Sequence, residues 1–189
     1  MSDMAAVERL RASVPPIDLG AVHDFQQIQI RGVSLAIDRD SRERLDAMAA
    51  LSGPGAVQAL PALVAMLDQD RTTSVSGDLT ARLAAGTGTS DDARRGENMA
   101  AFAEADLACQ VAAQDALAKA AVAAVPALLD ALKSASTNRR IGAAKVLGQI
   151  GKPAAAASDA LKALGANDTS ELVRTAAKAA SKLVKPGWW

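Results

Sequence analysis

The sequence predicts an all-α protein, a short row of helical hairpins preceded by a small β-hairpin. Two observations predict the helices: half of the 189 residues are apolar, mostly alanine, valine and leucine, and a pattern of paired helical segments repeats along the chain. A third predicts the β-hairpin, because apolar and polar residues alternate early in the chain. We therefore divide the chain into an N-terminal extension (1–40), a repeat domain (41–184) with an insertion (69–98), and a C-terminal tail (185–189).

The N-terminal extension contains the predicted β-hairpin, "FQQIQIRGVSLAID" at residues 25–38. Isoleucine alternates with glutamine before "RG", and valine, leucine and isoleucine alternate with other residues after it. A glycine-bearing turn therefore joins two strands. An isolated hairpin is marginally stable in water, so we expect this one to pack on the helices. An open edge could also accept a strand from another chain.

The clearest repeat lies toward the C-terminus. The segment "AVPALLDALKSASTNRRIGAAKVLGQIGKP" (124–153) predicts a helix, a polar turn and a second helix, and "ASDALKALGANDTSELVRTAAKAASKLVKP" (157–186) repeats it about 33 residues later. Both end in Lys-Pro, which stops a helix because proline has no N–H to donate. Apolar residues at helical spacing predict that the last helix covers residues 169–184.

An earlier copy of the first helix lies upstream, in "ALPALVAMLD", where Pro61 matches Pro126 of the later segment. Both prolines are predicted in a first helical turn, where the missing N–H costs no hydrogen bond. The turn that should follow is replaced by the insertion at 69–98, which is rich in glycine, serine and threonine, and the second helix resumes over 99–120. Loops this long are usually functional or disordered, so we expect the rest of the chain or a partner to hold it.

These units resemble HEAT repeats, specifically the short bacterial repeats related to those of phycobilisome lyases. "GQIG" at 148–151 matches the family's signature at the end of the second helix, and the later "SKLV" departs from it. The family's Val-Arg at the start of that helix is present as Val173-Arg174 and is replaced by Arg140-Ile141 one unit earlier. The resemblance covers the repeat domain and implies a HEAT-like solenoid of stacked helical hairpins. It also implies binding of other macromolecules, the family's common role.

Residues suited to catalysis or to metal binding are few. His23 is the single histidine and Cys109 the single cysteine, so we predict no metal site and no Cys–His pair. We expect a local turn or cap at His23, a buried free thiol at Cys109, and capping or solvation of Asp91-Asp92. The loop "GTGTS" lacks the Gly-Lys-Ser/Thr ending of a phosphate-binding loop. The sequence therefore predicts a non-enzymatic protein without a cofactor, and a lyase-type enzyme is an alternative with weak support in a chain so poor in histidine and aromatic residues.

Charge is divided unevenly along the chain. Residues 1–132 contain 11 basic and 18 acidic residues, and residues 133–189 contain 10 basic and 3 acidic ones. Solvated helix faces or an acidic partner would both explain this division. The basic residues of the second helices recur at helical spacing and are predicted to form a positive strip for a partner: Arg139, Arg140, Lys145, Arg174, Lys178, Lys182 and Lys185. The strip suits an acidic protein surface; nucleic acid is the alternative, as in some HEAT-like DNA glycosylases.

The tail "KPGWW" contains two of the four aromatic residues, Trp188 and Trp189. Two interpretations stay open. The indole rings could cover the apolar face of the last hairpin, which a solenoid must cap. They could instead insert into a partner, because tryptophan is enriched among interface hot spots. Both residues therefore join the predicted partner-binding set.

The function expected from these observations is a non-catalytic protein–protein interaction or scaffold module, a subunit or accessory factor of a larger assembly. The alternative is a nucleic-acid-binding module that uses the same strip, which a steep loss of binding with salt would reveal. Self-association between unlike charged ends is also open. The start of the chain has no basic segment ahead of an apolar one, and the longest apolar run, 120–132, is too short for a bilayer. We therefore expect a cytoplasmic protein without membrane insertion.

Overall fold

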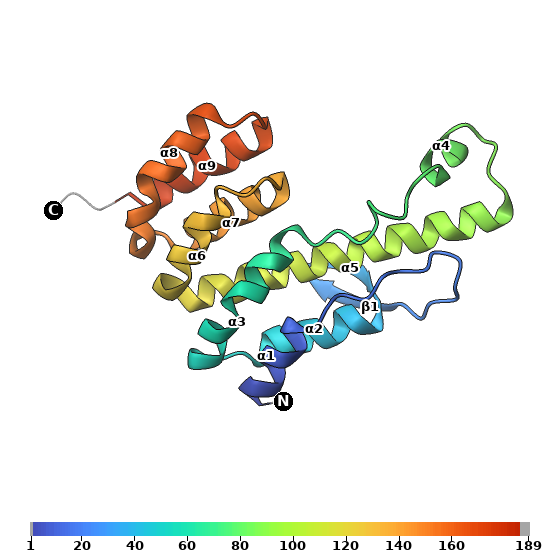
Figure 1. Cartoon of the computed structure of the whole chain (residues 1–189), viewed down its shortest axis with the longest axis horizontal. Coiled ribbons are helices and arrows are strands. Elements are labelled where there is room, and N and C mark those ends of the chain that lie inside the picture. Colours follow the sequence, from blue (N-terminus) through green and yellow to red (C-terminus); the bar gives the residue numbers. More distant parts are fainter. Residues whose placement is uncertain (1, 186–189) are drawn as a thin grey trace.

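The computed structural model describes residues 2–185. The chain is mostly helical, with one two-stranded antiparallel sheet near the N-terminus (Figure 1), which confirms the predicted all-α class with an N-terminal hairpin. The longest helix, α5 (Ser90–Ala120), runs through the middle of the molecule. The N-terminal helices and the C-terminal hairpins pack on different parts of it.

Three helices from the first part of the chain pack together: α1 (Asp3–Arg11) packs on α2 (Arg39–Ala50) and on α3 (Gly53–Ala65), and α2 and α3 pack against α5. Sequence analysis did not predict α1. Its signals are a cap, since Ser2 accepts a hydrogen bond from the Ala5 N–H, and a buried stripe that includes Val7 and Leu10. The stripe is short, which is why it escaped a search for longer periodic segments.

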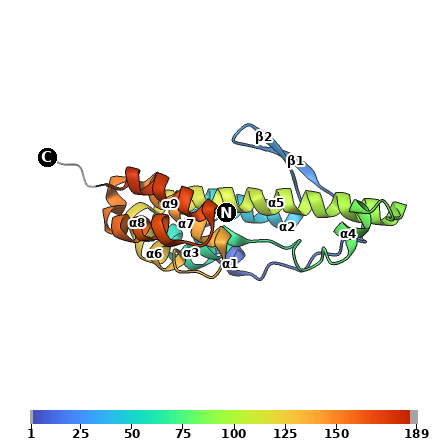
Figure 2. The same ribbon diagram turned by 90° about the horizontal axis from the view of Figure 1, so that it is seen from above.

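The β-hairpin consists of β1 (Gln26–Ile30) and β2 (Val33–Ile37), as predicted. Arg31 and Gly32 both have positive φ, 50° and 82°, which is the geometry of the tight hairpin turn that follows strand twist. The apolar face of the hairpin packs on α5, where Leu35 and Ile37 cover two fully buried alanines. Figure 2 shows the hairpin on one side of α5, with α1 and α3 on the other.

The prediction that Pro61 begins a helix is wrong. Helix α3 begins at Gly53 and takes Pro54 in its first turn, so Pro61 lies in its interior. An interior proline leaves one helical carbonyl without its usual donor. That carbonyl belongs to Val57, a residue that is 47% exposed, so water can reach this part of the helix. Pro126 does lie in a first helical turn, as predicted, at the start of α6 (Val125–Ala131).

The insertion is partly helical. The short 3-10 helix η1 (Met66–Asp68) ends α3, and α4 (Leu79–Ala84) occupies the middle of the insertion. Helix α5 then begins at Ser90, earlier than the predicted residue 99, because Thr89 and Asp92 form a reciprocal capping box. Capping was one of the two roles predicted for Asp91-Asp92, and Asp92 has it.

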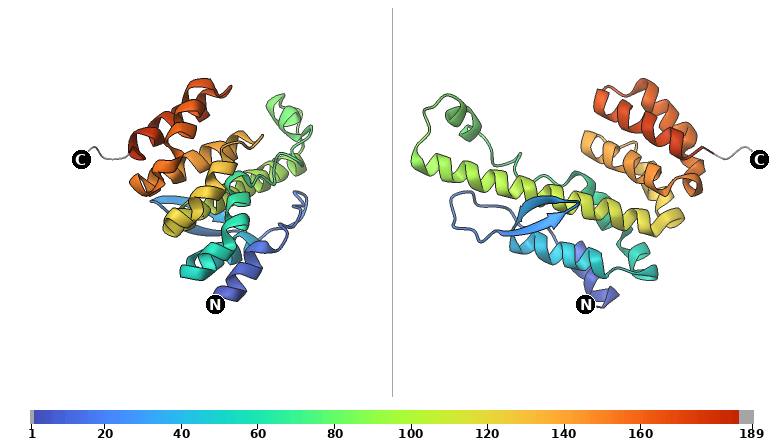
Figure 3. Two further views of the ribbon diagram at one scale, coloured as in Figure 1. Left: turned by 60° about the vertical axis from the view of Figure 1, so that its left-hand side comes forward. Right: turned by 180° about the vertical axis from the view of Figure 1, so that it is seen from behind.

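The C-terminal part consists of two helical hairpins. A 3-10 turn, η2 (Ala121–Ala124), leads from α5 to α6, which pairs with α7 (Thr137–Ile150); after η3 (Lys152–Ala157), α8 (Ser158–Asn167) pairs with α9 (Glu171–Leu183). Helix α9 confirms the helix predicted over 169–184. Helix α7 packs against both α5 and α9, so the second helices of successive hairpins lie side by side (Figure 3).

The stretch Ser90–Ala131 is long and apolar enough to cross a membrane, judged by length and composition alone. Sequence analysis missed this, because it considered only the apolar run at 120–132. In the fold, α5 is a central core helix, and Cys109, Ala113 and Leu117 on it are fully buried against other parts of the chain. A buried core helix passes the same test as a membrane span, so the expected location stays a prediction.

Candidate protein-binding groove

A groove of about 490 Å³ crosses the surface formed by α5, α7 and α9. Leu107 and Val111 of α5 form one wall, and Ala176, Ala179 and Leu183 of α9 form the other. Leu107 is 49% exposed and Leu183 is 58% exposed, so both walls present apolar surface to solvent. Single exposed leucines are ordinary, but Leu107 and Leu183 line the same concave surface, which is the kind of site that can receive a ligand. We call this feature the three-helix groove.

Helix α7 provides the floor of the three-helix groove, through Lys145, Gly148 and Gln149. Gly148 lets α9 approach closely, because a Cβ at this position would lie 3.2 Å from both Cα and Cβ of Ala180. Lys145 is exposed on the floor. Among the described residues, the lysines that form ion pairs are Lys133 and Lys162. The ammonium group of Lys145 is therefore available to a ligand in the groove.

Gln114 contributes the polar group of the α5 wall. It lines the three-helix groove and is only 8% exposed. No group in the described part of the chain is hydrogen-bonded to its amide, and the amide atoms are not sealed from solvent. An amide offers two donor hydrogens and one acceptor oxygen, the complement of a peptide group. Gln114 is thus a buried polar side chain with free hydrogen-bonding capacity at the groove.

Arg31 closes one end of the three-helix groove. It lies at the tip of the β-hairpin, lines the groove and pairs with Asp115 of α5. Both side chains are about half exposed, at 52% and 46%, so this ion pair contributes little to stability. Its structural effect is positional, since it joins the tip of the hairpin to the helix that forms the wall.

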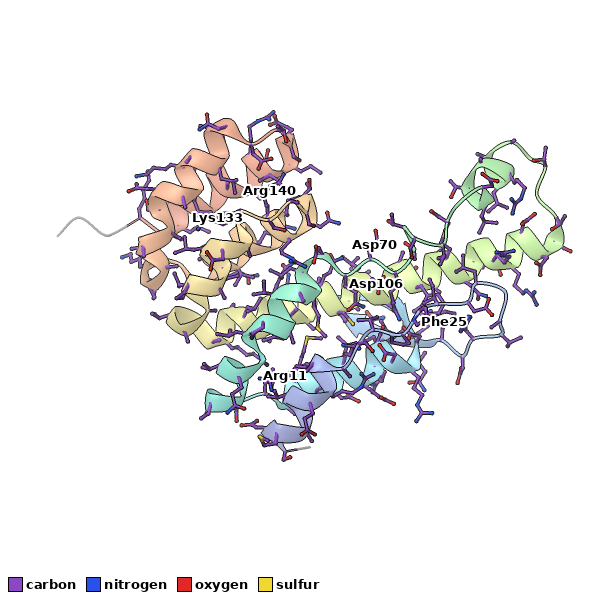
Figure 4. The ribbon with its side chains drawn as sticks, viewed as in Figure 1. Arg11, Phe25, Asp70, Asp106, Lys133 and Arg140 are labelled. Carbon is purple, nitrogen blue, oxygen red and sulfur yellow. The ribbon has the colours of Figure 1, made fainter. Side chains whose placement is uncertain are left out.

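Three of the predicted partner-binding residues have ion pairs inside the fold. Arg139 pairs with Asp68 at 2.7 Å and joins α7 to the end of η1. Arg140 pairs with Asp168 at 2.8 Å and joins α7 to the turn between α8 and α9 (Figure 4). The hydrogen bond from Arg140 is the main reason that the pKa of Asp168 lies below its ordinary value. Arg174 pairs with Glu171 on its own helix.

Arg140 and Arg174 have the same position in their hairpins. Nη1 of Arg140 donates to the carbonyl oxygens five and six residues before it, and Nη1 of Arg174 does the same in the next hairpin. Each arginine therefore fastens the turn between the two helices of its own hairpin. We call these contacts the arginine clamps. The repeat in the sequence sets Arg140 opposite Val173. The contacts in the structure make Arg140 equivalent to Arg174 instead, a difference of one position.

The lysines of α9 lie away from the three-helix groove. A Cβ on Gly165 of α8 would lie 3.0 Å from Cγ of Lys178, so the stem of this lysine runs over α8. With 3.6 residues per turn, Lys178 and Arg174 lie on the opposite side of α9 from Ala176 and Leu183. Lys182 and Lys185 are exposed.

The seven predicted basic residues thus do not form one continuous strip, because three are bound within the fold and the lysines divide between two sides. Their contact with a partner stays a prediction. Trp188 and Trp189 lie outside the described residues.

The most buried ionic cluster is one that sequence analysis missed. Arg71, at the start of the insertion, donates to Asp106 of α5 (labelled in Figure 4) at 2.6 Å and to Asp38 before α2 at 3.0 Å. Burial alone would raise the pKa of Asp38, but hydrogen bonds from Arg71 and Ser41 outweigh it and lower that pKa. We call this the Arg71 cluster. All three guanidinium nitrogens of Arg71 have partners within the fold, as expected of a structural anchor, and the cluster answers the expectation that the chain holds the insertion.

His23 and Cys109 are placed as expected from the sequence. Nε2 of His23 lies 2.6 Å from the carbonyl oxygen of Asp18, a local contact. Cys109 is buried, and desolvation raises the pKa of its thiol to about 11, so it is a poor nucleophile. Within residues 2–185, no three histidine, cysteine or carboxylate side chains are grouped so that they could hold a metal ion.

Comparison of the chain with family models, with curated proteins and with solved structures found no match.

Proposed function

We propose that the chain is a short HEAT-like solenoid in which helical hairpins stack and their second helices line one surface. Two observations support this. The arginine clamps give the α6–α7 and α8–α9 hairpins the same internal contacts. Helix α7 packs between α5 and α9, the order expected when second helices stack side by side.

We propose further that the protein is a non-catalytic interaction module, a subunit or accessory factor of a larger assembly, and that the three-helix groove binds a segment of a partner protein. The observation that carries this proposal is the combination of an exposed leucine on each wall, Leu107 and Leu183, with the free amide of Gln114 on the α5 wall. Apolar side chains of the partner would cover Leu107 and Leu183, and a peptide or side-chain amide would bind Gln114. Lys145 favours a carboxylate nearby. An amphipathic helix with an acidic residue carries these groups on one face.

Nucleic acid has less support as the ligand. Binding to phosphates needs several free cationic groups along one surface. The guanidinium groups of Arg139 and Arg140 are paired with aspartates, and Lys145 is the lysine on the floor of the groove. The groove walls are apolar, which suits a protein segment better than a phosphate backbone.

A pair of matched substitutions tests the groove. Ala179→Glu places a charge on the α9 wall, and Ala103→Glu places the same charge on an exposed position of α5 that lines none of the described cavities. We expect a protein captured from native lysate by the wild type to be retained by Ala103→Glu and lost by Ala179→Glu. For the purified partner, a charged carboxylate on the apolar α9 wall, which can also occupy Lys145, should weaken binding at least about tenfold. Equal capture by all three proteins would contradict a role for the groove.

A chain that ends at Lys185 tests the tryptophan tail separately. If partner capture depends on the tail, Trp188 and Trp189 belong to the interface. If capture is unchanged and still sensitive to Ala179→Glu, the groove alone accounts for binding. Retention of nucleic acid by every variant, with binding that falls steeply as salt rises, would favour the nucleic-acid alternative over the protein-binding one.

A further inference from the structure

The two edges of the β-hairpin differ. The outer edge of β2 faces α5, where the Ala36 N–H donates to Oε2 of Glu104 at 2.7 Å. Strand β1 pairs with β2 on one side only, and its other side has no neighbouring strand in the described chain. Its outer backbone groups are therefore free to pair with another strand. Natural edge strands are usually protected by charged residues, proline or a bulge. Residues Gln26–Ile30 contain none of these.

The register of the hairpin identifies which groups on β1 point outward. Opposite residues in an antiparallel pair alternate between those that bond each other and those whose groups point away. Because the Ala36 N–H points to Glu104, Ala36 and its partner Gln27 form a pair of the second kind. Gln29, two residues further, is then also of this kind. The free edge of β1 thus presents the N–H and C=O groups of Gln27 and Gln29.

We propose that this edge pairs with β1 of a second copy of the chain, antiparallel, about a two-fold axis through Ile28. In this register Gln27 lies opposite Gln29 of the second copy, and Gln29 lies opposite its Gln27. Each pair exchanges both backbone hydrogen bonds. The result is a four-stranded sheet across two molecules. Every donor that one strand presents meets an acceptor on the other, as a two-fold interface requires.

Three further properties of β1 suit a second copy. The strand is uncharged, so two copies meet without like-charge repulsion. The side chains of Gln27 and Gln29 lie on the face away from α5, where glutamine amides of the two copies can bond each other. On the opposite face Ile28, which is only half-buried, meets Ile28 of the second copy and extends the apolar layer over α5. The interface is smaller than that of a stable dimer, so we expect a weak, concentration-dependent association.

Charge substitutions at the two glutamines test both the association and its register. The double variant Q27K/Q29K places like charges opposite each other across the axis in both pairs. The double variant Q27E/Q29K places opposite charges there instead and changes the same two positions. Directly opposite side chains of like charge destabilise a strand pair, and unlike charges stabilise it.

The measurement is sedimentation velocity of the full-length chain and both variants, at low salt and from micromolar to near-millimolar concentration. We expect the wild type to associate as its concentration rises, Q27K/Q29K to need at least about tenfold more protein, and Q27E/Q29K to associate as well as or better than the wild type. Circular dichroism and thermal unfolding check that both variants fold. A third variant, Gln29→Pro, removes one outward N–H without breaking the β1–β2 ladder and should also abolish association.

Three outcomes would overturn the proposal. The wild type could remain a monomer at every concentration. All variants could associate equally, which would place the contact elsewhere. Both charge variants could lose association alike, which would contradict the register. None of these results depends on the three-helix groove, because Ala179→Glu should leave the self-association unchanged.

Discussion

Arg71 holds the start of the insertion against two helices at once. Its side chain is 7% exposed and donates to Asp106, Asp38 and Ser41, and its guanidinium group lies 5.0 Å from the centre of the Phe102 ring. Gln69 also donates to Asp106. A charge buried so deeply is stable only while its partners are in place. Asp106 on α5 is therefore a main anchor for the start of the insertion, since it accepts hydrogen bonds from both Arg71 and Gln69.

Substitution of that carboxylate should be costly. Asp106→Asn keeps the shape of the side chain but removes the charge that compensates Arg71. We expect a loss of about 3 kcal/mol in the free energy of unfolding, measured by urea titration, and faster cleavage of the insertion by a protease. Asp115→Asn, at a half-exposed pair, is the control and should change stability by less than about 0.5 kcal/mol. Equal effects of the two substitutions would contradict the anchoring role.

The pair between Asp168 and Arg140 predicts a specific pH dependence. Because the folded-state pKa of Asp168 is lowered, its stabilising effect is complete above the ordinary value of 3.8 and is lost as pH falls through the folded pKa. Asp168→Asn should therefore lower the urea midpoint at pH 7. The difference from the wild type should narrow as pH falls below 3.8, provided that the chain is still folded there. A difference that stays constant with pH would exclude an ionic contribution.

At the scale of elements, the contact between α7 and α9 depends on a residue without a side chain. Gly148 lies against Ala180, and a Cβ there would touch backbone as well as side chain. The same glycine forms part of the floor of the three-helix groove. Gly148 therefore affects both how closely α7 and α9 pack and the shape of the groove floor.

A larger side chain at this position should separate the two helices. We expect Gly148→Val to lower the free energy of unfolding by about 2 kcal/mol, since overpacking forces a backbone shift. Gln149→Val adds the same side chain at the next, exposed position and should have a much smaller effect. The comparison is made by urea titration. A neutral result for Gly148→Val would mean that α9 moves freely on α7.

The same elements indicate how far sequence analysis reaches. Helix α9 and the β-hairpin were predictable because their apolar residues recur with a local period. Helix α5 was placed too late, because the capping box at Thr89 lies within a glycine- and threonine-rich stretch that resembles a loop. The start of α3 was predicted too late, near Pro61, because proline is more common in the first turn of a helix than in its interior.

The groove could not be predicted at all. It depends on how α5, α7 and α9 sit relative to one another, and it joins residues as distant in sequence as Leu107 and Leu183. The Arg71 cluster escaped for the same reason, since Asp38, Arg71 and Asp106 come from three separate segments. By contrast, the burial of Cys109 followed from the alanine-rich helix around it.

For the molecule as a whole, one hydrophobic core connects the N-terminal helices to the last hairpin. The same cluster of buried residues extends from Ala6 in α1 to Val184 after α9, and Cys109 lies within it. A core without a break favours unfolding in one cooperative step. The two C-terminal hairpins are thus coupled energetically to the helices at the N-terminus.

The thiol of Cys109 provides the measurement. With a pKa near 11, the native thiol should react with a thiol reagent at pH 8 at least about 100-fold more slowly than in the unfolded chain. In urea, the midpoint of thiol exposure should coincide with the midpoint of helix loss by circular dichroism. Exposure of the thiol at a lower urea concentration would show that α5 separates from α2, whose Ser41 carbonyl oxygen lies beside Cys109, before the helices unfold.

The arginine clamps suggest how hairpins could be added to such a chain during evolution. A hairpin whose turn is closed by its own arginine needs a neighbour to cover its apolar face and, for Arg140, to supply the aspartate that pairs with it. Duplication of one hairpin within the gene would therefore add a unit whose turn is already closed and whose faces match those beside it. The array could lengthen by copying without redesign of its turns. An arginine near the start of each second helix would then be the sequence mark by which longer descendants are recognised.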